Sequence, residues 1–115
     1  MVRRYDERIH EKRKMFGGEG EVLFHRILNG PDEMYGKGRV FSHAVLEKGA
    51  EVAWHVHHGD GETYLILKGE GLYNDNGVQR RGEAGDVTFT DDGEGHALRG
   101  ISDEPLEAIA LVLYK

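Results

Sequence analysis

The sequence predicts an all-β sandwich or barrel. Strand-like runs rich in apolar and β-branched residues recur about every ten positions after residue 20, as is typical of such folds. Seventeen glycines and only two prolines suit many tight turns between these runs. No long helical periodicity interrupts the series, which argues against an alternating α/β fold. A chain of 115 residues is expected to form one such domain.

The first 20 residues differ from the rest. Residues 4–16 are strongly charged, and Tyr5, Ile9 and Phe16 are spaced roughly as on one face of a helix. We therefore expect an N-terminal arm or short helix within residues 1–20. It should end at FGGEGE, because paired glycines disfavour a helix interior. The barrel domain is expected over residues 21–115.

The strands of the barrel are expected in chain order. The candidate segments are 21–28, 38–49, 52–57, 63–69, 71–81, 86–90, 96–100 and 106–114. The run 63–69 is apolar on both faces, as expected of a strand that is covered on each side. Asn76-Gly77 divides 71–81 into two strand-like halves, which predicts a hairpin with a type I′ turn.

The stretch GAEVAWHVHHGDGETYLILKG, residues 49–69, concentrates groups that bind metals. Residues two apart on a strand point to the same side, so His55 and His57 can converge on one ion. The GDG turn lets Glu62 open the next strand and bring a carboxylate back to that ion. A solvated, histidine-rich turn is the simpler alternative, but the spacing of the histidines, the glutamate and the flanking glycines favours a metal site.

Two motifs in the sequence resemble those of the cupin superfamily. The first motif is matched at its key positions, Gly49, His55, His57, Glu62 and Gly69. The second is matched by GDVTFTDDGEGHALRG, residues 85–100, with Gly85, Gly93 and His96 in register. Asp91 replaces the usual proline and Gly100 the usual asparagine. Neither position is a metal ligand in the family, so these departures concern the rigidity of turns.

The resemblance implies a double-stranded β-helix, or small jelly roll, in which His55, His57, Glu62 and His96 bind one divalent transition metal ion. Three imidazoles and one carboxylate suit Mn, Fe, Ni, Cu or Zn better than Mg or Ca, which prefer oxygen ligands. Four protein ligands would leave an octahedral ion two positions for water or a chelating ligand. A structural zinc site is more often closed and tetrahedral.

Two residues are candidate catalytic groups. Tyr64 shares the parity of Glu62, so it should line the cavity, where its hydroxyl needs a hydrogen-bond partner. His43 lies in the middle of a strand and is either an acid–base group in the cavity or a structural histidine. His25 has the same ambiguity.

The outer surface of the barrel predicts a partner. Leu65 and Leu67 should point outward, and apolar outer strands in a small barrel usually need a cover. The N-terminal arm or a second subunit can provide it. Because cupins commonly form homodimers, we expect a homodimer.

Composition excludes several classes of partner. A net charge of −6 and a pI of about 5.6 argue against binding to nucleic acid or to an anionic membrane surface. The apolar run 109–113 is too short to span a bilayer, and the charged N-terminus contains no apolar signal core. The absence of cysteine fits a reducing compartment. We expect a soluble cytoplasmic protein.

The favoured function is metal-dependent chemistry, dioxygenase-like or isomerase-like, on a small polar organic molecule. The alternative is a non-catalytic protein that binds or senses a small molecule with the help of the metal. The fold does not decide between them, because one fold supports many functions.

Overall fold

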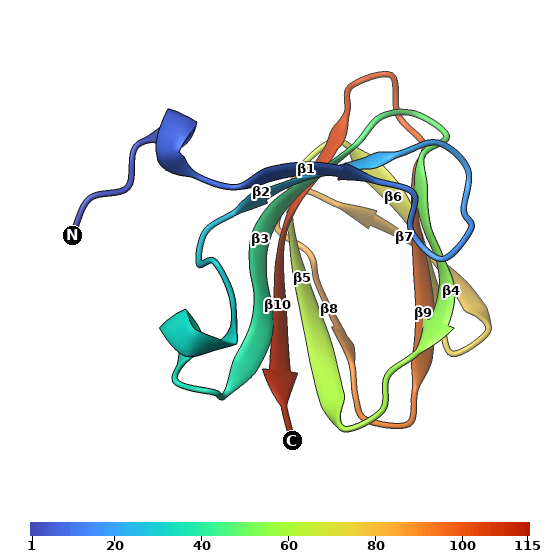
Figure 1. Ribbon diagram of the computed structural model, residues 1–115. Helices are drawn as coiled ribbons and strands as arrows, with labels where there is room; N and C mark the ends of the chain where they lie inside the picture. The colour runs from blue at the N-terminus through green and yellow to red at the C-terminus, as the bar shows by residue number, and fades with distance from the viewer.

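The computed structural model describes residues 1–115 as two antiparallel sheets that face each other (Figure 1). The six-stranded sheet has the order β1-β2-β3-β10-β5-β8, and the four-stranded sheet has the order β4-β9-β6-β7. The strands are β1 His10–Arg13, β2 Val22–Arg26, β3 Gly38–Leu46, β4 Glu51–Val56, β5 Asp60–Lys68, β6 Glu70–Asp75, β7 Val78–Glu83, β8 Val87–Thr90, β9 Gly95–Gly100 and β10 Leu106–Tyr114. Two 3-10 helices, η1 Tyr5–Glu7 and η2 Pro31–Met34, lie outside the sheets, and neither could cross a membrane.

The hydrophobic core lies between the sheets. On β10, alternate residues are buried, namely Leu106, Ala108, Ala110 and Val112, while the residues between them are partly exposed. This is the period of two that a strand imposes on its side chains. Ile66 and Leu98 approach the same core from β5 and β9. The predicted all-β fold is therefore confirmed.

Strand boundaries differ from those predicted by a few residues. The strand β5 begins earlier than predicted, at Asp60, because residues 60–62 pair with the end of β10. The predicted hairpin joins β6 to β7, and Asn76 and Gly77 at its tip have φ values of 52° and 95°. Positive φ at both central residues is the property that defines a type I′ turn.

The N-terminal segment forms more sheet and less helix than expected. The helix η1 has only three residues, and His10–Arg13 forms strand β1 against β2. The chain then crosses to the other sheet, where Met15 forms a bridge with Val52 of β4. Cross-strand pairing thus overrides the local helical spacing. This segment, expected as an arm, is part of the barrel wall.

Gly69 offers a test of the backbone that carries the first motif. Gly69 has φ 73°, and a Cβ there would lie 2.7 Å from the carbonyl oxygen of Pro105. Gly36 has a similar φ of 68°, but a Cβ there would meet open space. Both Gly→Ala changes should cost about 1–2 kcal/mol from the left-handed backbone. Gly69→Ala should cost about 1–3 kcal/mol more from overlap with Pro105.

Urea unfolding of the two alanine variants measures this difference in the free energy of unfolding. Equal losses in Gly69→Ala and Gly36→Ala would contradict the close approach of the chain at Pro105.

Candidate metal centre

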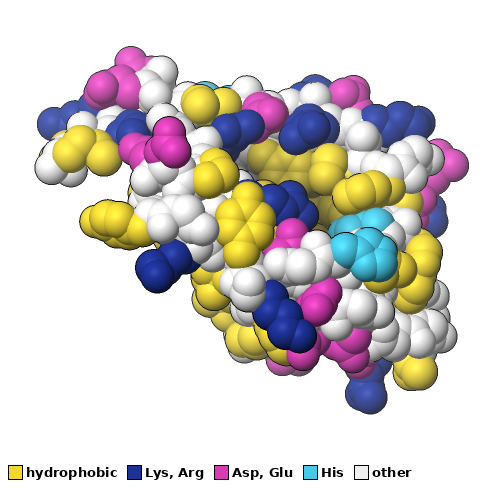
Figure 2. Space-filling view, turned by 60° about the horizontal axis from the view of Figure 1, so that its bottom comes forward, with side chains coloured by type: hydrophobic (Ala, Val, Ile, Leu, Met, Phe, Trp, Pro, Cys, Tyr) yellow, Lys and Arg dark blue, Asp and Glu magenta, His cyan; other side chains and the backbone are white.

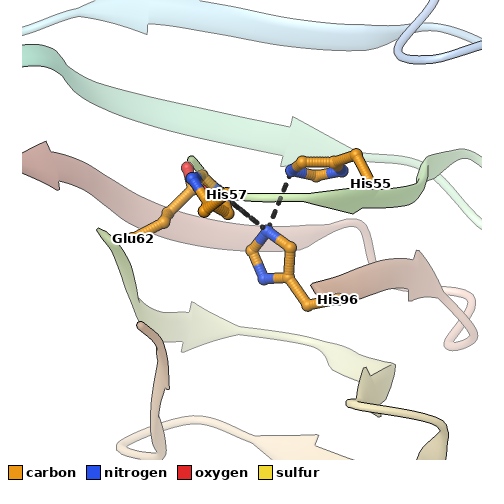
Figure 3. A group of neighbouring side chains, drawn as sticks. All are labelled: His55, His57, Glu62 and His96. Atoms are coloured by element: carbon orange, nitrogen blue, oxygen red, sulfur yellow. Dashed lines mark hydrogen bonds and ion pairs between the residues drawn. The ribbon is translucent and has the colours of Figure 1, made fainter. Parts of the chain in front are cut away.

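Four side chains from both sheets meet inside the barrel. His55 lies on β4, and its Cα pairs directly with that of His96 on β9. His57 follows the last residue of β4, and Glu62 lies on β5 in the opposite sheet. Figure 3 shows that all four point toward one another. These are the four residues predicted to form the metal site.

The facing atoms of this cluster are close enough to share one ion. Nε2 of His96 lies 3.0 Å from Nε2 of His55 and 3.1 Å from Nε2 of His57. Oε1 of Glu62 lies 3.3 Å from Nε2 of His57 and 3.1 Å from Nε2 of His96. All four donor atoms lie within 4.8 Å of one another.

The outer nitrogens of two histidines are held by acceptors. Nδ1 of His55 donates to the carbonyl oxygen of Ala53 at 2.8 Å. Nδ1 of His57 donates to Oδ1 of the buried Asp60 at 2.6 Å. Each acceptor fixes the proton on Nδ1 and turns the lone pair of Nε2 toward the centre.

His96 is held by two hydroxyl groups. Its Nδ1 lies 2.8 Å from Oγ1 of Thr90 and 3.0 Å from the hydroxyl of Tyr73, and these hydroxyls also bond to each other. Either oxygen can accept the Nδ1 proton. When the protons lie on Nδ1, the three Nε2 lone pairs point at one position and would repel unless a cation lies between them. That cation can be a transition metal ion or, in the metal-free state, a proton shared with Glu62.

Glu62 is the charged member of the cluster. Burial alone would raise its pKa, but hydrogen bonds with His57 and His96 outweigh burial and lower the pKa of Glu62 from 4.5 to about 2. The carboxylate is therefore ionised at neutral pH. It in turn raises the pKa of His57, so a proton competes with a metal ion for Nε2.

A cavity of about 250 Å³ opens beside the cluster. Its wall includes His55, His57 and Glu62, many apolar side chains, and the three arginines Arg13, Arg26 and Arg39. Figure 2 shows a hollow in this face of the molecule, with an apolar floor and charged and histidine side chains around it.

The arginines of the cavity wall are partly neutralised. Arg39 donates to Asp60 at 2.8 Å, and Arg26 donates to Glu11 at 2.5 Å. Arg13 is exposed and lies 3.8 Å from the same Glu11. With the ionised Glu62, three guanidinium groups thus face three carboxylates, so the charges of these side chains balance.

Phe16 closes one side of the site. Its ring stacks on the ring of His55 with centroids 4.0 Å apart and an angle of 11° between the planes. The backbone of Phe16 has φ 56°, which costs about 1–2 kcal/mol in a residue other than glycine. The stacked ring both shields His55 and narrows the cavity.

Tyr64 lies where the sequence predicts it. It is buried, lines the cavity, and stacks on His96 with centroids 5.5 Å apart. Burial and the charge of Glu62 raise the pKa of Tyr64 well above its usual value, so the hydroxyl stays protonated. It can donate a proton or a hydrogen bond, but it is no base at neutral pH. Its catalytic role stays a prediction.

His43 lies on the outer face of the six-stranded sheet, because its neighbours Ser42 and Ala44 occupy the buried face of β3. Its Nε2 donates to Glu107 at 2.7 Å, and it does not line the cavity. A catalytic role for His43 stays a prediction that this placement does not support. His25 lies on the same outer face, opposite His43.

Sequence reasoning missed the groups that surround the ligands. The sequence alone assigns Asp60 no role beyond the turn. Its position three residues after His57 could have indicated that it accepts a hydrogen bond from that histidine. Arg13, Arg26 and Arg39 carry no such signal, since they come from three different strands.

A family model, described as the cupin domain, matches residues 42–113. The chain therefore belongs to the cupin family. The match contains all four residues of the metal cluster, whereas Arg13, Arg26 and Arg39 precede it. The buried cluster could hold a metal ion in this cupin barrel.

Two matches from Thermotoga maritima cover most or all of the chain. One, named an oxalate-binding protein, is 40% identical over 99 residues, which are 86% of this chain and 81% of that protein. The other is a crystal structure titled a predicted oxalate decarboxylase, with 39% identity, a TM-score of 0.93 and complete coverage of both chains.

A more distant structure shows the shared fold alone. It is an uncharacterised protein from Klebsiella pneumoniae with a double-stranded β-helix domain. Its TM-score is 0.71 at 23% identity, over 98% of this chain and 84% of that one.

Asp60 should matter for metal binding although it is no ligand in the cluster. Asp60→Ala removes the acceptor that orients His57, and loss of such a partner typically weakens metal affinity about 10–100-fold. Asp103→Ala is the matched control, because Asp103 is 95% exposed and pairs only with Lys48. Titration of the apo-proteins with Mn²⁺ or Zn²⁺ measures both. Equal affinity in the two variants would contradict the role of Asp60.

Proposed function

We propose that this protein binds a small dicarboxylate, of which oxalate is the simplest, at a metal ion held by His55, His57, Glu62 and His96. One observation carries the proposal: the buried cluster opens into a small cavity whose wall holds three arginines. The name of the oxalate-binding relative, at 40% identity, supports it.

The residues present suit this ligand. A divalent transition metal ion bound here supplies a Lewis acid that carboxylate oxygens can chelate. The guanidinium groups of Arg13, Arg26 and Arg39 offer planar donors that pair with carboxylates and offset their charge. Because these arginines are balanced by Glu11, Asp60 and Glu62, the charge of a bound divalent ion would make the site net positive and favour anions over neutral sugars.

The size of the cavity favours a small ligand. Its volume of about 250 Å³ is below the usual range of about 300–1,000 Å³ for drug-sized ligands. Phe16 and Met15 narrow it from the side of the N-terminal segment. Apolar walls around a few polar groups exclude water and strengthen the pairing of charges inside.

Turnover of the bound acid is a second candidate, either decarboxylation or the oxygenase-like or isomerase-like chemistry expected from the sequence. Such reactions need a group that transfers a proton near the ligand. Two residues in the wall qualify: Glu11, which pairs with Arg26, and the protonated Tyr64. The relative titled a predicted oxalate decarboxylase gives this candidate further support.

Arg13→Gln should weaken the binding of oxalate about tenfold or more, since a hydrogen bond to a charged group contributes about 1.5–3 kcal/mol. Arg13 is the best choice because it does not contact the partners of the metal ligands. Arg80→Gln, on β7 and exposed, is the matched control. Calorimetric titration of the Mn²⁺-loaded proteins with oxalate, and with acetate for comparison, gives the dissociation constants.

The proposed ligand class would be refuted if the wild-type protein bound acetate as tightly as oxalate, or if it bound neither acid. If ¹³C-labelled oxalate stays unchanged by NMR when mixed with the Mn²⁺-loaded protein under air, the protein binds and does not turn over. Labelled formate and carbon dioxide would establish the second candidate.

We also propose that two copies of the chain form a homodimer through the outer face of β10, β5 and β8. This face carries the exposed apolar side chains Leu65, Leu67, Val87, Phe89 and Leu113. The register places Leu65 beside Val87, and Thr63 beside Phe89, so these side chains are contiguous. The N-terminal segment leaves them uncovered, and a large exposed apolar patch typically marks an interface.

Phe89→Lys should shift the protein from dimer to monomer, because it places a charge in the apolar face that the proposed dimer would bury. Val78→Lys is the control, since Val78 is equally exposed but lies at the hairpin of the other sheet. Light scattering after gel filtration measures both masses. A wild-type monomer at micromolar concentration would rule out this interface.

A further inference from the structure

Three histidines form a row on the outer face of the six-stranded sheet. The register pairs His10 of β1 with His25 of β2, and His25 with His43 of β3. Side chains of residues paired across strands are neighbours on one face. Because His43 faces outward, the whole row lies outside the barrel, on the opposite side of the sheet from the cluster at His55.

His10 and His25 bring two ring nitrogens face to face. Their Nδ1 atoms are 2.7 Å apart, and the ring centroids are 4.8 Å apart. Nε2 of His10 lies 2.7 Å from the carbonyl oxygen of Tyr5, which can only accept a hydrogen bond. His10 therefore carries its proton on Nε2 and directs the lone pair of Nδ1 at His25.

A metal ion can occupy the position between these nitrogens after a small movement of the rings. Zinc–nitrogen bonds of 2.0–2.1 Å place two ligand nitrogens about 3.3 Å apart in a tetrahedral site. Both rings are free to move by this amount, because His10 is exposed on an edge strand and His25 is only partly buried.

His43 is the next imidazole in the row, on the other side of His25 from His10. Its ring centroid lies 5.6 Å from that of His25. Its Nε2 donates to Oε1 of Glu107 at 2.7 Å, which leaves the lone pair on Nδ1. A carboxylate behind a histidine is the arrangement that commonly orients a metal ligand and raises its basicity.

The surroundings of His25 favour its neutral form. Burial, followed by the positive charges that His10, His43 and Arg8 can carry, lowers the pKa of His25, while Glu107 raises it. A neutral ring is the form that binds a metal. Arg8, which donates to the carbonyl oxygen of His25 at 2.9 Å, opposes a cation, and Glu107 offsets it.

We propose that His10 and His25, with His43 beside them in the row, form a second metal site, on the outer surface, for a divalent ion that prefers nitrogen ligands, such as Zn²⁺, Ni²⁺ or Cu²⁺. Such an ion connects β1 to β2. Along β1, His10 points outward while Glu11 and Arg13 line the cavity. An ion on the outer face therefore holds in place the strand that forms part of the cavity wall.

The test is the number of Zn²⁺ ions bound per chain, measured by equilibrium dialysis and elemental analysis on protein without a histidine tag. Wild type should bind two equivalents, and His25→Asn and His10→Asn should each lose one. Glu62→Gln and His96→Asn should keep the outer equivalent. His58→Asn, which changes an exposed histidine outside both clusters, should still bind two.

One equivalent in wild type, or two in His25→Asn and His10→Asn, would overturn the proposal and leave a plain hydrogen bond between the two rings. His10→Asn covers the case in which His25→Asn fails to fold. A second readout is the electron paramagnetic resonance of Cu²⁺ added to Glu62→Gln, in which nitrogen couplings should be present and should disappear when His10→Asn is added.

Discussion

The structure depends on burying four polar side chains between two sheets, in a space that a small barrel would otherwise fill with apolar groups. Such burial is costly unless every polar atom has a partner. Here the outer nitrogens of His55, His57 and His96 are bonded to the protein. The inner nitrogens of His57 and His96 meet Glu62, and that of His55 meets His96. The arrangement fits a cation, which satisfies all four donor atoms at once.

The metal cluster could be predicted because it depends on rules that act over short distances. Alternation along a strand directs His55 and His57 to one side, and the turn at GDG returns Glu62 from the next strand. His96 needed the second motif, since only the pairing of β4 with β9 brings it opposite His55. The Asn76-Gly77 turn could be predicted equally well, because the positive φ values that it requires depend only on these two residues.

The residues around the cluster could not be predicted from such rules. β1 is a four-residue charged strand without apolar alternation, and it exists because β2 pairs with it. The ion pairs of Arg26 with Glu11 and of Arg39 with Asp60 join residues 15 and 21 positions apart. The face on which His43 lies depends on which side of β3 packs against the core, and the pattern along β3 is ambiguous.

The cupin match begins at residue 42, and every arginine of the cavity wall precedes it. Under the proposed function, part of the ligand selection therefore comes from residues that precede the matched cupin domain. This leading stretch also supports the cluster, because Phe16 stacks on His55 and Arg39 donates to the Asp60 that holds His57. A chimera that takes residues 1–41 from a homologue would exchange all three arginines, and it would need an aromatic residue at position 16 to keep the stack on His55.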